Sequence, residues 1–306
     1  MKQFGIKIAL FGISLVCCIL LLTFVNKTII EIKAPFKLKP KEHILILGDS
    51  HTAFAFNDSM MLNTRNFSSA ADSYFYSYKK LKEITNNNNN NNQIDTLLLS
   101  FSSHNINADI EQRWLLNNNH LEDRLKTYFP LLDFNDQKFL LKHKPIQLFK
   151  GSFSQLLLSY ELIKKGSATY GGYKNLNHNI LEDELNKINI DLKKNSTFKM
   201  AMIEKVYLEK IITYSKQNNI YLIFVNPPIH KAVNKDQKKL YYLYEKYFNK
   251  VPFYDMSKLD MSDDCFGDLV HLSPKGAKQF TTWFERNNIL NKKKAIEHNI
   301  LYKQTY

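Results

Sequence analysis

The stretch HILILGDSHTAF, His43 to Phe54, joins an apolar run to the polar sequence Gly-Asp-Ser-His. A short apolar run that ends at turn-forming residues is typical of a parallel strand covered on both faces. Gly-Asp-Ser can be an ordinary turn after such a strand. It can also hold the Ser50 hydroxyl at the carboxyl end of a central strand, where open α/β sheets bind their ligands. The stretch alone leaves both interpretations open, so the choice depends on residues elsewhere in the chain.

Apolar runs and helix-forming segments alternate along much of the remaining chain. Strands are expected near residues 43–48, 66–69, 95–102, 220–226 and 251–256, and helices near residues 72–85, 196–219, 235–250 and 273–288. Ser273 is a good N-cap for the last helix, and Pro274 suits its first position. Strands that alternate with helices form parallel sheets through right-handed crossovers. We therefore expect an α/β fold, a three-layer α/β/α sandwich with a parallel, doubly wound sheet.

The amino-terminal segment has the composition of a membrane-spanning helix. The run from Ile8 to Val25 contains no charged residue, and as a helix it is about 27 Å long, close to the hydrocarbon thickness of a bilayer. Lys2 and Lys7 precede it as in a signal peptide, but no small-x-small cleavage site follows it. We therefore expect a signal anchor, or transmembrane helix, at residues 1–26 and an extended basic tether at residues 27–41.

The lysines on the two sides of this segment favour opposite orientations. Those before it favour a cytoplasmic amino terminus, whereas Lys27, Lys33, Lys37, Lys39 and Lys41 favour the reverse. Long domains are translocated largely regardless of charge. We therefore expect a protein attached to the membrane by one helix, with its domain outside the cytoplasm, on the periplasmic or extracellular face.

Composition restricts the class of protein further. The 306 residues are 44% hydrophobic, which indicates a packed core, and the formal net charge is +13. Such a charge can attract nucleic acid, but no zinc knuckle, RNP-type motif or helix-turn-helix accompanies the lysines, so solvated lysine-rich faces are the simpler explanation. Only Cys265 lies outside the first hydrophobic segment. A cysteine-ligated zinc site is therefore excluded, and we expect no metal and no nucleic-acid partner.

We expect the main domain to cover residues 42–290 and to be followed by a carboxyl-terminal tail at residues 291–306. Within it, residues 105–196 do not continue the strand–helix alternation. This segment contains helix-forming stretches and is interpreted as a largely helical insertion, which can form a substrate cleft or a partner surface. The asparagine run at residues 86–92 is interpreted as a solvated loop.

The residues that could give Ser50 a chemical role lie near the other end of the chain. In CFGDLVHLSPKGA, Asp268 and His271 are three residues apart, directly before the last predicted helix. A serine nucleophile needs a base for its proton, and an imidazole base needs an acceptor that fixes its tautomer. One short Asp-x-x-His loop supplies both groups. Together with a Gly-Asp-Ser sequence after the first strand, the loop favours the catalytic interpretation.

With these two motifs the chain resembles the SGNH, or GDSL-like, hydrolases. Gly48–His51 is similar to the first conserved block of that superfamily, and Asp268–Ala277 is similar to the last. The resemblance implies a metal-free α/β/α hydrolase of esters, thioesters or acylated sugars. It implies that Ser50 is the nucleophile, His271 the general base and acid, and Asp268 the carboxylate that orients His271.

The two middle blocks of the superfamily are altered here. The resemblance implies oxyanion donors at Ser50, at Ser68 in place of a glycine, and at His104 or Asn105 in place of an asparagine. A missing donor would reduce the rate by about 10²–10³. His51 and His230 follow predicted strand ends and are candidates for the lining of the cleft, although His51 can equally pack beside the site and the prolines before His230 can simply end a strand.

Two functions remain as hypotheses. The first is a membrane-anchored serine esterase or O-acyltransferase that works through an acyl-enzyme without a cofactor, on acylated cell-envelope carbohydrate or another ester. Hydrolysis and transfer differ only in whether water or a sugar hydroxyl attacks the acyl-enzyme. The alternative is a non-catalytic envelope module that has the same fold and binds glycan or protein.

Overall fold

The structure, a computed structural model, describes residues 1–88, 94–176, 178–191, 199–233, 238–287 and 289–290. The predicted tail at residues 291–306 lies outside the described residues. The chain divides into two compact units, of which the first combines Met1–Phe36 with Gln112–Tyr170 and the second combines Lys37–Glu111 with Gly171–Tyr306. Residues 105–196, which were predicted to form an insertion, therefore contribute to both units.

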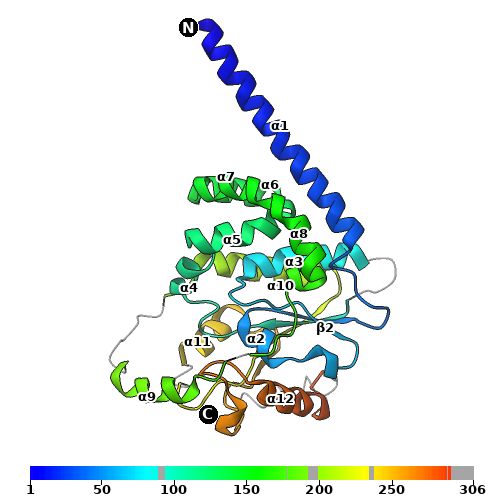
Figure 1. The fold of residues 1–306 in the computed structure, drawn as a ribbon. Coiled ribbons are helices and arrows are strands. Elements are labelled where there is room, and N and C mark those ends of the chain that lie inside the picture. Colours follow the sequence, from blue (N-terminus) through cyan, green and yellow to red (C-terminus); the bar gives the residue numbers. More distant parts are fainter. Residues whose placement is uncertain (89–93, 177, 192–198, 234–237, 288, 291–306) are drawn as a thin grey trace. The chain divides into compact units, whose positions relative to one another are not determined.

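The second unit is built on a five-stranded parallel sheet in the order β2-β1-β3-β4-β5 (Figure 1). The strands are β1 (Ile44–Leu47), β2 (Thr64–Asn66), β3 (Thr96–Ser100), β4 (Tyr221–Asn226) and β5 (Phe253–Asp255). Their register pairs Ile44 with both Thr64 and Thr96, and Phe224 with Phe253. Consecutive residues of the central strands are buried, as in a sheet that is covered on both faces. The expected α/β class and parallel sheet are confirmed.

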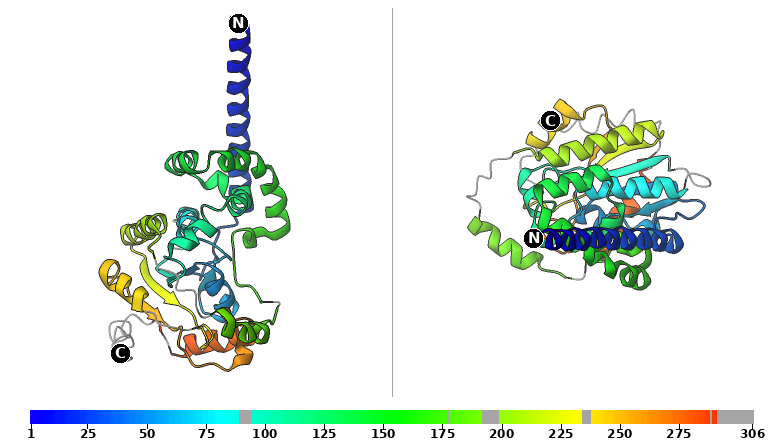
Figure 2. Two further views of the ribbon diagram at one scale, coloured as in Figure 1. Left: turned by 90° about the vertical axis from the view of Figure 1, so that its left-hand side faces the viewer. Right: turned by 90° about the horizontal axis from the view of Figure 1, so that it is seen from above.

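Helices connect the strands of this unit. They are α2 (Ser50–Ala55), η1 (Asp58–Met60), α3 (Tyr74–Asn88), α9 (Leu181–Asp191), α10 (Met202–Gln217), α11 (Lys238–Tyr247), η5 (Asp263–Cys265) and α12 (Pro274–Arg286), and α4 (Ala108–Arg113) ends where the first unit resumes. Helices α3 and α10 lie side by side (Figure 2). Helix α3 extends to Asn88, into the asparagine run, whose residues 89–92 lie outside the described residues.

The starts of α12 and α10 can be compared with the helix starts that the sequence predicted. Ser273 caps α12 by accepting a hydrogen bond from the amide of Gly276, and Pro274 is its first residue, as predicted. Helix α10 instead begins after Ala201, which makes no side-chain cap bond. The sequence predicted this helix from about residue 196, and residues 196–198 lie outside the described residues.

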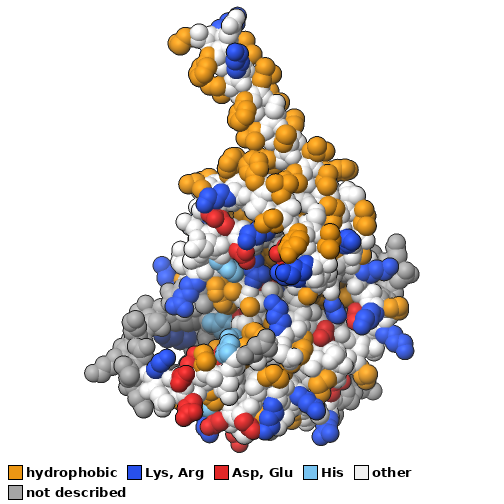
Figure 3. Space-filling view, in the orientation of Figure 1, with side chains coloured by type: hydrophobic (Ala, Val, Ile, Leu, Met, Phe, Trp, Pro, Cys, Tyr) orange, Lys and Arg blue, Asp and Glu red, His pale blue; other side chains and the backbone are white. Residues whose placement is uncertain are grey.

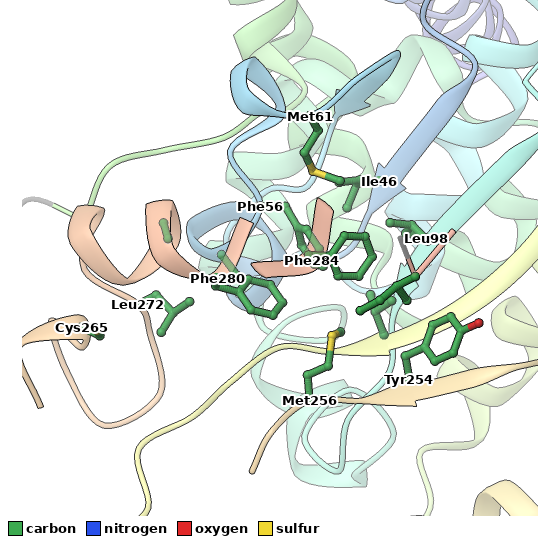
Figure 4. Packing of buried hydrophobic residues seen from close by; sticks show 14 of the residues in the cluster. Ile46, Phe56, Met61, Leu98, Tyr254, Met256, Cys265, Leu272, Phe280 and Phe284 are labelled. Carbon is green, nitrogen blue, oxygen red and sulfur yellow. The ribbon is translucent and has the colours of Figure 1, made fainter. Parts of the chain in front are cut away.

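The last helix closes a hydrophobic core against the sheet. Phe280 and Phe284 of α12 each pack edge-to-face on Phe56, with ring centroids 5.1 Å apart (Figure 4). Ile46 and Leu98 supply the strand side of this core, and all five residues are essentially inaccessible to solvent. Burial of side chains this large contributes roughly 1.5–3 kcal/mol each. This packing fixes the loop before α12, which carries Asp268 and His271, to the sheet edge that carries Ser50.

The first unit consists of helices only. They are α1 (Lys2–Lys33), α5 (Asn118–Tyr128), η2 (Phe129–Leu131), α6 (Phe134–His143), α7 (Pro145–Ser154), η3 (Gln155–Leu157), α8 (Leu158–Lys165) and η4 (Gly166–Thr169). Helix α1 is long and apolar enough to cross a membrane, and the most apolar window of α1 is fully exposed. The amide of Asn26 in α1 donates to the main-chain and side-chain oxygens of Gln155, at 2.9 and 3.1 Å.

The extended tether predicted at residues 27–41 is wrong in part. Helix α1 continues to Lys33, where Ala34 adopts a left-handed conformation and its amide bonds to Ile30. The helix continues because Ile30 is buried within the first unit. Phe36 and Leu38 are buried as well, and the Phe36 ring lies 4.4 Å from that of Tyr170. Apolar side chains between the lysines therefore hold this segment against folded structure.

Candidate active site

Ser50 lies at the turn from β1 into α2. Gly48 has φ +151°, and a Cβ atom there would lie 2.3 Å from Cβ of Ser100 and 2.6 Å from Oγ1 of Thr52. Only glycine fits such a position, because it combines a positive φ with a close approach of neighbouring strands. Asp49 then caps α2 by accepting a hydrogen bond from the amide of His51. Ser50 is therefore the first residue of a helix at the carboxyl end of a central strand.

His271 links Ser50 to Asp268. Nε2 of His271 is 2.8 Å from the hydroxyl oxygen of Ser50, and Nδ1 is 2.8 Å from Oδ2 of Asp268. The ring is only partly buried, with 18% of the side chain exposed. It also packs edge-to-face on Phe54, with centroids 5.1 Å apart. The three residues that the sequence singled out thus form one continuous hydrogen-bonded chain.

The loop of Asp268 holds its carboxylate firmly. Oδ1 accepts hydrogen bonds from the amides of Val270 and His271, at 2.9 and 2.8 Å. Burial alone would raise the pKa of this carboxyl group, but the hydrogen bond and charge of His271, helped by the Val270 amide and by His178, hold the pKa well below its usual value. Asp268 is therefore ionised at neutral pH, and its Oδ2 accepts a hydrogen bond from the N–H group at Nδ1 of His271.

His178 is a fourth member of this chain that the sequence did not indicate. Its Nε2 lies 3.1 Å from Oδ2 of Asp268, and half of its side chain is exposed. It comes from the segment after Gly171, which crosses the site through hydrogen bonds from Lys174 to Ala53 and from Ile180 to Gly267. The amide of Leu269 also donates to Glu184 of α9 at 2.9 Å. Part of the predicted insertion therefore supports the Asp268 loop.

A second carboxylate, Asp49, organises the other side of Ser50. Asp49 is fully buried and accepts hydrogen bonds from Nε2 of His104, from the Asn105 amide at 2.8 Å and from the Ser100 hydroxyl at 3.3 Å. Burial opposes ionisation, but the nearby His104, His51 and Asn105 outweigh it and hold the pKa of Asp49 well below its usual value. Sequence analysis did not assign a role to Asp49, although it is adjacent to Ser50.

Some of the oxyanion donors suggested by the resemblance already make internal hydrogen bonds, and others do not. The amide of Ser68 donates to Oδ1 of Asn66 at 2.8 Å, so it is already used. His104 is also used, because Nε2 binds Asp49 and Nδ1 lies 2.7 Å from the Ser102 hydroxyl. Asn105 gives one amide hydrogen to Asp49 and retains a second. The amide of Ser50 has no acceptor within α2, because it begins that helix. Ser50 and Asn105 therefore remain the better candidate donors, whereas the Ser68 amide and the His104 ring are already engaged in internal hydrogen bonds.

The two additional histidines occupy different environments. The ring of His51 lies 4.1 Å from that of His104 and 5.2 Å from that of His271, measured between centroids. Burial and the neighbouring His104 lower the pKa of His51 to about 3, so it is neutral, and its Nδ1 is buried without a hydrogen-bond partner among the described residues. His51 is thus well placed to line the site.

His230 does not line it. Only 2% of His230 is exposed, its Nε2 lies 3.2 Å from Asp263, and its Nδ1 accepts a hydrogen bond from the amide of Ala232. Its own amide donates to the carbonyl of Leu269, the residue after Asp268. His230 therefore supports the Asp268 loop from behind, and the prediction that it lines the cleft is wrong.

No protein-family model matches this chain, and neither does any curated protein. The site defines an α/β protein with a serine, a histidine and an aspartate in hydrogen-bond contact at the edge of a parallel sheet.

Proposed function

We propose that the protein is a membrane-anchored serine esterase or O-acyltransferase of the SGNH type. The observation that carries the proposal is the contact of Ser50 with His271 at 2.8 Å, together with the contact of His271 with Asp268 at 2.8 Å. These distances are those of a nucleophile, its base and the group that orients the base. The residues come from opposite ends of the domain.

The chemistry follows from the direction of these hydrogen bonds. Oγ of Ser50 attacks the carbonyl carbon of an ester while Nε2 of His271 takes the hydroxyl proton. The ester bond breaks, the leaving alcohol receives that proton, and the acyl group stays on Ser50. Water or a sugar hydroxyl then attacks the acyl-enzyme, giving its proton to His271 and releasing Ser50. Asp268 stabilises the imidazolium in both steps.

Two groups are available to stabilise the negative oxygen of the tetrahedral intermediate. One is the main-chain amide of Ser50 at the start of α2, and the other is the free amide hydrogen of Asn105. Asp49 holds the side chain of Asn105 by accepting its other hydrogen. Each such donor contributes about 10²–10³ in rate.

The proposal includes a three-layer α/β/α sandwich with a doubly wound sheet. Both faces of the sheet are buried, and the helices that cover them come from both ends of the unit, α3 and α10 against one face and α12 against the other (Figure 1). Ser50 directly follows the turn after β1, an inner strand that lies between β2 and β3 in the sheet. This architecture and site support the likeness to SGNH hydrolases.

The substrate class is inferred from the amino-terminal helix. Helix α1 is long and apolar enough to span a membrane, which supports a protein attached to the cell envelope. We propose that the domain lies outside the cytoplasm and acts on acylated envelope glycan. No cofactor is needed for this reaction.

Labelling with a fluorophosphonate tests the proposal. The reagent forms a covalent bond with an activated serine, so the purified chain should be labelled and Ser50→Ala should not be. Ser59→Ala is a matched control, because Ser59 is exposed and its hydroxyl bonds to Asn57. Absence of labelling of the folded wild type, or labelling that persists in Ser50→Ala, would contradict the proposal.

A non-catalytic envelope module is the second candidate function. It is favoured by the use of the Ser68 amide and the His104 ring in internal hydrogen bonds, which removes two expected oxyanion donors. Turnover of p-nitrophenyl acetate separates the candidates. Equal rates for wild type and His271→Ala would favour the binding module, whereas a large loss in His271→Ala would favour the enzyme.

A further inference from the structure

Three consecutive helices of the first unit carry large apolar side chains that are open to solvent. Phe134 and Leu141 on α6, Ile146 and Phe149 on α7, and Leu156, Leu157, Tyr160 and Ile163 on η3 and α8 are each more than half exposed. We call these eight residues the outer stripe. Within each helix they are mostly three, four or seven residues apart, so they share one face.

The same helices bury a different set of residues. Leu140, Leu158 and Leu162 are buried inside the first unit. Helix α7 approaches α5 closely at Gly151, where a Cβ atom would lie 2.6 Å from the side chain of Leu125. Packing of the unit is thus supplied by the inner faces, and the outer stripe is not needed for it. Exposed apolar faces on helices that contact one another in sequence, α6 with α7, α7 with η3 and η3 with α8, are typical of an interaction surface.

Helix α1 indicates what this surface contacts. It packs against α7, η3 and α8 in the same unit, and its uncharged run from Ile8 to Val25 ends just before Asn26. Asn26 and Thr23 both hydrogen-bond to Gln155 at the start of η3. If α1 spans a bilayer, the bilayer surface lies near Thr23 and Asn26, and therefore at the level of α7 and α8. Figure 3 shows apolar side chains around α1 where it meets these helices.

The charges around the outer stripe fit a lipid surface. Between Phe134 and Lys165 the chain has six lysines and two acidic residues. Lys138, Lys142 and Lys164 are exposed next to residues of the stripe. Amphipathic helices with aromatic and aliphatic residues on one face and lysines beside them lie in the headgroup layer of anionic membranes.

We propose that α6, α7 and α8 lie flat on an anionic bilayer, with the outer stripe in the boundary between headgroups and acyl chains. Helix α1 and this surface then form two attachments, one that crosses the membrane and one that lies on it. The second attachment holds the first unit in a fixed orientation at the membrane. The inference depends on α1 lying in a membrane and not on the chemistry proposed for Ser50.

Nitroxide labels on the full-length chain in vesicles test this proposal. Cys17 and Cys18 are replaced by serine, because they are exposed, while Cys265 is buried. Single cysteines at Phe149 or Ile163 are then labelled, in vesicles of phosphatidylcholine and phosphatidylglycerol. We expect collisions with oxygen to exceed those with a water-soluble nickel chelate several-fold at both positions.

Leu62→Cys is the matched control. Leu62 is also apolar and exposed, but it belongs neither to α1 nor to the outer stripe, so the nickel chelate should dominate there. The charge-reversed variant Lys138→Glu/Lys142→Glu should increase access of nickel to a label at Phe149. Nickel access at Phe149 and Ile163 equal to that at Leu62 would overturn the proposal. Spin–spin broadening with low access of both reagents would overturn it too, because it would show that a second copy of the chain covers the stripe.

Discussion

Replacement of Asp268 by asparagine separates the orienting role of this carboxylate from its structural role. Oδ1 of Asp268 accepts the amides of Val270 and His271, and Oδ2 faces the rings of His271 and His178. An asparagine can keep its oxygen toward the two amides, so the turn should survive. Its NH₂ group then replaces Oδ2 and confronts Nδ1 of His271, at a position 2.8 Å away.

The effect on catalysis follows from the histidine tautomer. Two N–H groups cannot face each other, so His271 in Asp268→Asn should carry its proton on Nε2 and accept at Nδ1. Nε2, which lies 2.8 Å from the Ser50 hydroxyl, then cannot take the serine proton. Loss of a general base, with loss of the charge that stabilises the imidazolium, lowers kcat by about 10²–10⁴, or roughly 3–5 kcal/mol of activation free energy.

The assay compares kcat for p-nitrophenyl acetate and the rate of fluorophosphonate labelling. Asp264→Asn is the matched control, because Asp264 lies in the same loop but is exposed and paired with Lys275. Circular dichroism and thermal unfolding in detergent check that both variants fold. An Asp268→Asn protein that folds and retains the activity of Asp264→Asn would refute the reasoning.

Three further predictions concern the donors, a buried acid and the turn. Asn105→Ala should lower kcat by about 10²–10³, whereas Ser68→Ala should keep wild-type kcat, because it removes only a hydroxyl that has no hydrogen-bond partner among the described residues and keeps the main-chain amide; both are checked with p-nitrophenyl acetate. Burial, reinforced by the charge of a neighbouring glutamate, raises the pKa of Glu204 from 4.5 to about 8. Between pH 4.5 and about 8 the folded state therefore keeps a proton on Glu204 that the unfolded state has already released. The free energy of unfolding falls as the pH rises through this window, in total by a few kcal/mol at most. Glu204→Gln should remove this fall, as measured by thermal unfolding at pH 5, 7 and 8.5. Gly48→Ala should lose about 2 kcal/mol or more in chemical denaturation, since its Cβ would lie 2.3 Å from Cβ of Ser100.

Four of the five strands were predictable because each contains a short apolar run next to turn residues, whereas β2 (Thr64–Asn66) is polar and overlaps the strand predicted at residues 66–69 only at Asn66. Thr96–Ser100 is buried throughout and Tyr221–Asn226 is buried from Leu222 onward, and both contain the apolar run expected of an inner parallel strand. The end of α1 was not predictable in the same way. Residues 27–33 mix two lysines, a glutamate and a threonine with three isoleucines, and of these seven residues only Ile30 is buried. Tertiary contacts therefore extended a helix where composition indicated a linker.

The candidate site likewise contains some residues that could be predicted from the sequence and others that could not. Ser50, Asp268 and His271 could be found because the residue types stand in short motifs next to a strand end and a helix start. His178 could not, because it lies in an irregular segment with no pattern, and its contact with Asp268 depends on the path of that segment across the site. The oxyanion donors could not be chosen either, since the choice depends on which amides are already hydrogen-bonded.

The site contains two aspartates with histidine partners, and the geometry decides between them. The Asp49 carboxylate is fully buried and accepts hydrogen bonds from His104, Asn105, Ser100 and the amide of His51. These donors occupy the lone-pair positions of the carboxylate, so none is left to orient the imidazole of a catalytic base. The carboxylate of Asp268 instead meets Nδ1 of His271, whose Nε2 reaches the Ser50 hydroxyl. Asp49 can therefore fix Asn105 and the start of α2, while Asp268 is the carboxylate placed to support the proposed transfer of a proton from Ser50.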